Sequence, residues 1–160
     1  MKFLLIFFFL SALPAYGKDT TKLYNPHANA EKDVAAAVIK AKQEGKNVLI
    51  QIGGNWCIPC YRFNAFLLTD PVLKKTLQDN FIVYHLNYSK ENRNNNFLKK
   101  LSINQQLKFP ALVILDSNGK KIHFQDITFL EKGNGYDYEK VKTFLLSWAP
   151  SSNSGVDYKE

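Results

Sequence analysis

Residues 48–60 read VLIQIGGNWCIPC: an apolar run, two glycines, and then two cysteines three positions apart. Cys57 and Cys60 are the only cysteines in the chain of 160 residues. The apolar run predicts a strand buried on both faces, and the glycines predict its end. If a helix begins near Cys57, both sulfurs lie on its first turn, where Pro59 is tolerated because its missing N–H has no intrahelical use.

That placement predicts different tasks for the two sulfurs. The free backbone amides and the positive end of a helix dipole would stabilise a thiolate on Cys57, lower its pKa and make it the attacking sulfur. Cys60 would be close enough to resolve a mixed disulfide, so that the pair forms a two-electron thiol–disulfide couple.

Two other interpretations of the cysteine pair stay open. Zinc takes four protein ligands, or three in an open site, and two sulfurs supply only half of a closed set. The histidines His27, His85 and His123 are scattered without ligand spacing. A purely structural disulfide would close too small a loop to constrain the unfolded chain much. We therefore predict a redox pair and no metal.

The segment WCIPC, residues 56–60, after a buried strand resembles the active site of the thioredoxin superfamily, whose members carry Trp-Cys-x-x-Cys at a strand-to-helix junction. A second match lies downstream, where Phe109-Pro110 precedes the apolar run 111–115 and the polar turn 116–120. That arrangement is similar to the family's cis-proline, the strand after it and the hairpin turn. The resemblance covers roughly residues 30–148 and implies a three-layer α/β fold, with a mixed central sheet and helices on both faces.

The same resemblance implies a thiol–disulfide oxidoreductase that acts on protein thiols and disulfides and is recharged by a redox partner. It implies no cofactor beyond the disulfide itself. Its implied catalytic residues are Cys57 and Cys60, and its implied substrate groove consists of Trp56, Ile58, Pro59, Phe109 and Pro110. Reduction, oxidation and isomerisation all stay open as directions. The alternative from another class is a non-catalytic thioredoxin-fold module that holds a partner or a metal ion.

One position departs from the family pattern. Thioredoxins carry a buried acid six residues before the first cysteine, and Gln51 stands there in this chain. Glutamine cannot relay a proton to or from Cys60. His85 falls where a lysine partner of that acid would lie, and a histidine that titrates near neutrality could take over the proton path. The alternative for His85 is a side chain packed on a strand face.

The chain begins with the features of a secretory signal. Lys2 precedes the apolar residues 3–10, Pro14 breaks a helix, and Ala15 and Gly17 are small residues. This pattern predicts a signal peptide over residues 1–17 and a periplasmic or secreted protein that starts at Lys18. The apolar segment is shorter than the about 20 residues that span a bilayer, so we expect no stable membrane anchor after cleavage.

Charge gives a weaker indication. The formal net charge is +7, and removal of the signal would leave about +6. The lysines are spread along the chain rather than gathered in a basic stripe with aromatics, which argues against a nucleic-acid partner.

The remaining elements follow from apolar periodicity and turn residues. We expect one domain over residues 30–148, after an irregular lead-in at 18–29 and before a disordered tail at 149–160. Helices are predicted at 30–44, 57–68, 71–78 (capped by Thr69 or Asp70), 97–101 and 137–148, strands at 47–52, 81–88, 111–115 and 121–125, and loops at 89–96 and 133–135.

Overall fold

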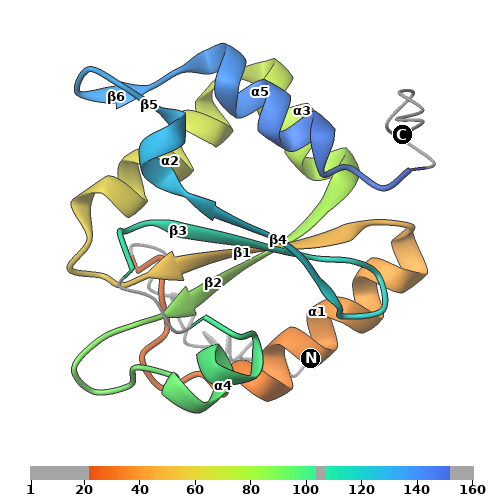
Figure 1. The fold of residues 1–160 in the computed structure, drawn as a ribbon, viewed down its shortest axis with the longest axis vertical. Helices are drawn as coiled ribbons and strands as arrows, with labels where there is room; N and C mark the ends of the chain where they lie inside the picture. Colours follow the sequence, from red (N-terminus) through yellow and green to blue (C-terminus); the bar gives the residue numbers. More distant parts are fainter. Residues whose placement is uncertain (1–21, 104–106, 152–160) are drawn as a thin grey trace, which may run out of the picture.

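A computed structural model describes residues 22–103 and 107–151 (Figure 1). The predicted signal peptide and residues 152–160 of the predicted tail lie outside the described residues. In chain order the elements are α1 (Ala30–Glu44), β1 (Asn47–Gly53), α2 (Ile58–Thr69), α3 (Pro71–Asn80), β2 (Phe81–Asn87), α4 (Asn95–Lys100), β3 (Ala111–Leu115), β4 (Lys121–Asp126), the short 3-10 helix η1 (Ile127–Leu130), β5 (Glu131–Lys132), β6 (Gly135–Tyr136) and α5 (Tyr138–Ser147).

Four strands form the central sheet in the order β2-β1-β3-β4. β1 pairs in parallel with β2 and antiparallel with β3, and β3 pairs antiparallel with β4. The parallel pair needs a crossover, which α2 and α3 supply, whereas β3 and β4 are joined directly as a hairpin. This arrangement confirms the predicted mixed sheet, and it leaves β1 at the centre, where every one of its residues is buried.

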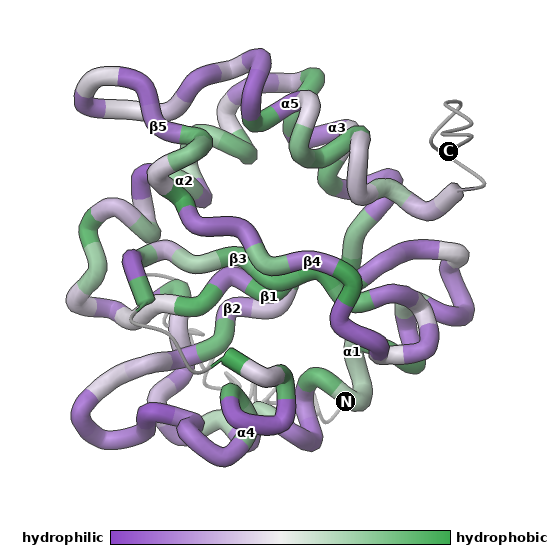
Figure 2. The backbone as a smooth tube through the Cα atoms, in the orientation of Figure 1, coloured by the Kyte–Doolittle hydropathy of each residue, from purple (hydrophilic) through white to green (hydrophobic). Residues whose placement is uncertain are grey.

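Two apolar cores flank the sheet. One lies against α1 and α4 and includes Val34 and Ile50, and the other lies against α2, α3 and α5 and includes Leu49 and Phe63. Because side chains alternate along a strand, β1 supplies both cores. Figure 1 shows α1 and α4 below the sheet and α2, α3 and α5 above it. In Figure 2 the segment between β2 and α4 is largely hydrophilic, whereas β1 carries hydrophobic residues through the middle of the molecule.

Local sequence sets the helix ends. The Asn29 side chain caps α1 by accepting a backbone N–H at 3.0 Å, and Gly45 ends that helix in the left-handed conformation, with φ of 63°. Asp70, rather than Thr69, caps α3 by accepting the N–H groups of Val72 and Leu73, each at 2.9 Å. Within the described ranges every helix is too short or too polar to cross a membrane.

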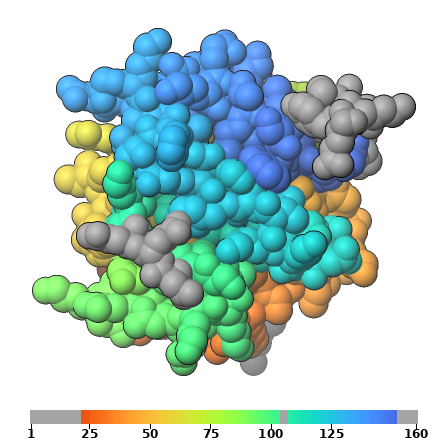
Figure 3. Space-filling view, in the orientation of Figure 1, coloured from red at the N-terminus to blue at the C-terminus, as the bar shows by residue number. Residues whose placement is uncertain are grey.

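Several segments differ from their prediction. Of the predicted loop at 133–135, residues 133–134 form the turn of the β5–β6 hairpin and Gly135 begins β6, and η1 was not expected. In the turn after β3, Gly119 has a positive φ of 82°. Ala149, at the start of the predicted tail, is buried. Figure 3 shows the face on which the edge strand β4 lies at the surface beside α5.

Candidate active site

Cys57 and Cys60 form a disulfide at the start of α2, with their Cα atoms 5.3 Å apart. Cys57 is the N-cap of the helix, and its sulfur accepts the backbone N–H of Cys60 at 3.2 Å. A donor aimed at this sulfur would favour a thiolate over a thiol after reduction. The local geometry is therefore the one that the sequence predicts, with β1 ending at Gly53 and α2 beginning at Ile58.

The two cysteines are both buried, with exposed fractions of 2% for Cys57 and 0% for Cys60. The reason is that Tyr24 packs in one cluster with both cysteines, and Leu23 and Phe109 pack against that cluster. A substrate sulfur must therefore approach Cys57 past these side chains.

Residues 22–29, which we call the strap, cross the cysteine motif and are pinned to it. The backbone N–H of Tyr24 donates to Asn55 Oδ1 at 3.1 Å, and Asn55 Nδ2 donates back to the Tyr24 carbonyl at 2.8 Å. The Tyr61 hydroxyl donates to the same Asn55 oxygen at 2.8 Å and accepts the Leu23 N–H at 3.2 Å. The sequence indicated only an irregular lead-in here, and it carried no signal that Tyr24 belongs to the site.

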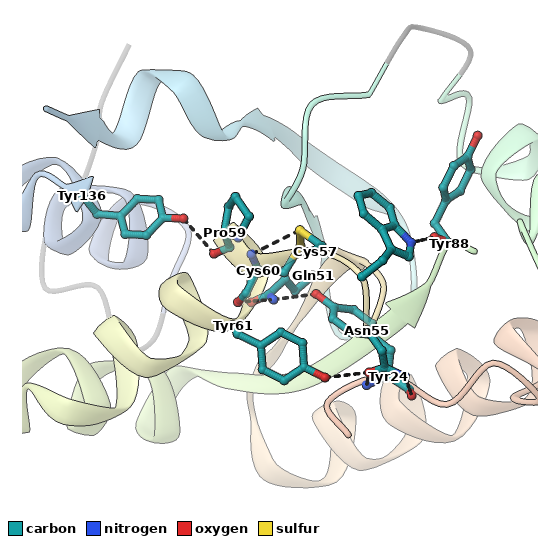
Figure 4. The surroundings of a disulfide bond; sticks show 10 residues. Tyr24, Gln51, Asn55, Cys57, Pro59, Cys60, Tyr61, Tyr88 and Tyr136 are labelled. Atoms are coloured by element: carbon teal, nitrogen blue, oxygen red, sulfur yellow. Dashed lines mark hydrogen bonds between the residues drawn. A yellow bond between two sulfur atoms is a disulfide. The ribbon is translucent and has the colours of Figure 1, made fainter. Parts of the chain in front are cut away.

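Gln51 lies beneath the cysteines and is 1% exposed. Its Nε2 donates to the Tyr24 hydroxyl at 2.7 Å and to the Cys60 carbonyl at 3.2 Å (Figure 4). The amide thus ties the strap, β1 and the first turn of α2 together. Gln51 is placed next to Cys60 as the alignment with thioredoxins suggested, and its contacts there are structural hydrogen bonds.

His85 lies beside Gln51, its register partner on β2, and packs edge-on against Tyr24 with ring centroids 5.6 Å apart. Its Nε2 is buried without a hydrogen-bond partner among the described residues. Burial lowers the pKa of His85 from 6.5 to about 4. The expectation that His85 titrates near neutrality is therefore wrong, because the surroundings disfavour the charged ring. Of the two alternatives, a histidine packed on a strand face is the one observed.

Aromatic side chains form a rim beside the disulfide. Trp56 is 55% exposed and donates its Nε1 hydrogen to the Tyr88 carbonyl at 2.8 Å. The Phe109 ring lies 5.2 Å from the Trp56 ring and 5.2 Å from the Tyr88 ring, between centroids. Ile58 projects outward and is 65% exposed. The rim thus brings together residues from three separate segments of the chain.

The Phe109–Pro110 peptide bond is cis, as predicted. Phe109 packs against the cysteine cluster, so the loop before β3 lies next to the disulfide. On the opposite side, the Tyr136 hydroxyl donates to the Pro59 carbonyl at 2.9 Å and connects β6 to the cysteine motif. Figure 4 shows Tyr136 and Tyr24 on opposite sides of the cysteine pair.

No group of three or more metal-ligating side chains occurs among residues 22–103 and 107–151. His123 lies on the edge strand β4 and stacks on Trp148, with ring centroids 4.1 Å apart. The described residues therefore offer the cysteines no additional ligands, and the arrangement is suited to thiol–disulfide chemistry.

Comparison with known proteins supports the same chemistry. A profile of the family described as thioredoxin-like matches residues 29–117. The thiol:disulfide interchange protein DsbD of Haemophilus ducreyi is 26% identical over 107 residues, which cover 65% of this chain and 18% of that protein. DsbD of Escherichia coli K12 is 24% identical over 112 residues, which cover 67% of this chain and 19% of that protein. The chain thus spans less than a fifth of the length of these relatives.

Two solved structures share the fold. The crystal structure of a disulphide isomerase from Xylella fastidiosa superposes with a TM-score of 0.66 at 22% identity, covering 78% of this chain and 95% of that one. The C-terminal domain of DsbD from Neisseria meningitidis, in its oxidised form, superposes with a TM-score of 0.55 at 16% identity, covering 76% of this chain and 97% of that domain. At these identities the likeness concerns the fold.

Proposed function

The chain belongs to the thioredoxin-like family, and on that premise we propose that it is a thiol–disulfide oxidoreductase that exchanges disulfides with protein substrates. The observation that carries the proposal is the Cys57–Cys60 disulfide at a helix start, with the Cys60 N–H aimed at the Cys57 sulfur. The similarity to the interchange protein DsbD supports the same reaction class.

In the reducing direction, the Cys57 thiolate attacks a substrate disulfide, and one substrate sulfur leaves as a thiolate. Cys60, as a thiolate, then attacks the Cys57 sulfur, the mixed disulfide breaks, and the second substrate thiolate leaves. The substrate gains two electrons and the protein is left with the Cys57–Cys60 disulfide. A separate dithiol partner must reduce that disulfide before the next turnover, and no cofactor is required.

The aromatic rim is the proposed substrate surface. Trp56 and Ile58 are the exposed apolar side chains next to Cys57, and Phe109, which precedes the cis Pro110, packs against the cysteine cluster. Pro59, between the cysteines, is held by Tyr136 through its carbonyl. An extended substrate segment could lie along this rim with apolar side chains on Trp56, while its disulfide meets Cys57.

The proposed place of action is outside the cytoplasm. The signal-like pattern of residues 1–17 supports export, after which Lys18 would be the first residue. The test is N-terminal sequencing of the protein from periplasmic and cytoplasmic fractions of its host. Recovery of a chain that still begins at Met1 in the cytoplasmic fraction alone would contradict export.

Two cysteine variants test the reaction. Cys57→Ser should abolish reduction of a protein disulfide, because the attacking sulfur is missing. Cys60→Ala should accumulate covalent complexes with substrates, because the resolving sulfur is missing. The complexes are detected on non-reducing gels and identified by mass spectrometry. If Cys57→Ser still forms these complexes through Cys60, the assigned roles are reversed, and if neither variant nor the wild type forms them, the proposed function fails.

A further inference from the structure

The Tyr24 hydroxyl and the Cys60 sulfur border the same small space beside Gly53. A Cβ atom built on Gly53 would lie 2.5 Å from Cys60 Sγ and 2.6 Å from the Tyr24 hydroxyl oxygen. That space would not hold one methyl group, and the absence of a side chain on Gly53 keeps it open. Tyr24 itself is 1% exposed, so its hydroxyl lies in the protein interior.

The hydrogen bond with Gln51 leaves the hydrogen of the Tyr24 hydroxyl free to be donated elsewhere. Gln51 Nε2 donates to the Tyr24 oxygen at 2.7 Å, so the oxygen acts there as an acceptor. The orientation of the Gln51 amide is determined by its second contact, because the same nitrogen lies 3.2 Å from the Cys60 carbonyl oxygen, where an amide oxygen would be repelled. Among the described residues no acceptor is assigned to the Tyr24 hydroxyl hydrogen.

We propose that the Tyr24 hydroxyl donates a hydrogen bond to the Cys60 thiolate and so assists the step in which Cys60 resolves a mixed disulfide. This inference rests on the proposed function. Reduction of the Cys57–Cys60 bond turns the Cys60 sulfur into an acceptor next to a buried donor. Gln51 acts as a positioning residue, because its amide holds the Tyr24 oxygen in place. Figure 4 shows the Tyr24 hydroxyl pointing toward Gln51 and the cysteine pair.

The chemistry of the step balances without a proton transfer from Tyr24. The Cys60 thiol first loses its proton to water, and the thiolate is stabilised by the phenol O–H. The thiolate then forms a bond to the Cys57 sulfur, the bond between Cys57 and the substrate sulfur breaks, and the substrate leaves as a thiolate. In the reverse direction, Tyr24 stabilises Cys60 as the leaving thiolate. Tyr24 keeps its proton throughout, which agrees with burial raising the pKa of this phenol above its ordinary value.

Other groups near Tyr24 do not replace this donor. The titratable side chains that face it are His85 from β2, Tyr61 from α2 and Tyr136 from β6. His85 packs edge-on against the Tyr24 ring, while the Tyr61 and Tyr136 hydroxyls donate to Asn55 and to the Pro59 carbonyl. The Tyr24 hydroxyl is thus the donor that the described residues place beside Cys60 Sγ on the side of Gly53.

The test follows the two sulfurs separately. Reduced protein is mixed with one equivalent of dithiobis(nitrobenzoate), whose thiolate is coloured, so the first release reports attack by Cys57 and the second reports resolution by Cys60. Both rates are measured by stopped flow across a range of pH. The variant is Tyr24→Phe, which removes only the hydroxyl, and the matched control is Tyr84→Phe. Tyr84 is also a partly buried tyrosine, and its hydroxyl lies 3.3 Å from Asp33 on the α1 side of the sheet.

Loss of a hydrogen bond to the Cys60 thiolate should raise the pKa of this thiol and move the midpoint of the second release to higher pH by about one to two units. The thiolate of a less acidic thiol is also a better nucleophile. The second release should therefore slow by only about three- to tenfold at pH 7. We expect this shift and slowing in Tyr24→Phe and a second release within about twofold of wild type in Tyr84→Phe. An unchanged midpoint in Tyr24→Phe, or an equal shift in Tyr84→Phe, would overturn the inference.

If Tyr24→Phe does not fold, fluorotyrosine placed at position 24 keeps the ring and supplies a more acidic donor, so the midpoint should move to lower pH, and an unmoved midpoint again overturns the inference. Because the coloured reagent reacts without any protein substrate, the second release reports on Tyr24 even if the trapping experiment fails. A failure of the proposed function is therefore distinguishable from a failure of this inference.

Discussion

Acidification from pH 7 to pH 5 should destabilise the fold through His85. Burial lowers the pKa of this ring from 6.5 to about 4, and its Nε2 has no hydrogen-bond partner among the described residues. In the window between these two values the unfolded chain binds a proton on His85 and the folded chain does not. The contribution to stability is therefore present above pH 6.5 and is lost as the pH falls toward 4.

The size of the effect follows from the two pKa values. The full loss, at a pH below both values, is about 3 kcal/mol. Between pH 7 and pH 5 the linkage relation gives a loss of about 2 kcal/mol, because the folded state is still neutral at pH 5 while the unfolded chain is mostly protonated. Most carboxylates titrate at lower pH, so histidine protonation accounts for most of the change in stability between pH 7 and pH 5.

The assay is urea unfolding of the oxidised protein at pH 7 and pH 5, for the wild type, His85→Leu and His27→Gln. Leucine at position 85 removes the buried titration, and His85 Nε2 has no hydrogen-bond partner to lose among the described residues, so this variant should keep most of its stability at pH 5. His27 is an exposed residue of the strap, and its variant should show the same loss as the wild type. If His85→Leu loses as much stability as the wild type, His85 is not the source and the argument from burial is wrong.

Two other substitutions test the packing behind the cysteines. Gly53→Ala should cost about 1 to 3 kcal/mol of stability, because its Cβ would lie 2.5 Å from Cys60 Sγ and 2.6 Å from the Tyr24 hydroxyl. Gly135→Ala, which meets nothing within 4 Å, is the matched control in thermal unfolding, and equal losses in both variants would refute the close approach. Gln51→Glu should cost about 3 kcal/mol at pH 7, because a buried carboxylate cannot donate to the two oxygens that the amide serves. Burial raises the pKa of such a carboxyl, so the loss should shrink as the pH falls and the protonated acid donates again; a loss that grows toward low pH would contradict this reasoning.

The sequence by itself was sufficient for the features that depend on neighbours along the chain. The apolar run before Gly53, the proline in the cysteine motif and Asp70, one of the two expected caps of α3, each act within a few positions. The mixed sheet followed from the family resemblance, and the polar turn at 116–120 favours the hairpin of β3 and β4. The cysteine pair and the cis peptide bond before Pro110 were accessible through the family pattern.

Tertiary structure alone decided what surrounds the two sulfurs. Tyr24 packs beside Cys60 because the strap binds Asn55, which lies 31 positions after Tyr24 in the chain. No local sequence pattern predicts that contact. The burial of Cys57 and the depressed pKa of His85 have the same origin. Desolvation depends on how much of the chain from distant positions packs around a group, and that quantity exists only once the layers have come together.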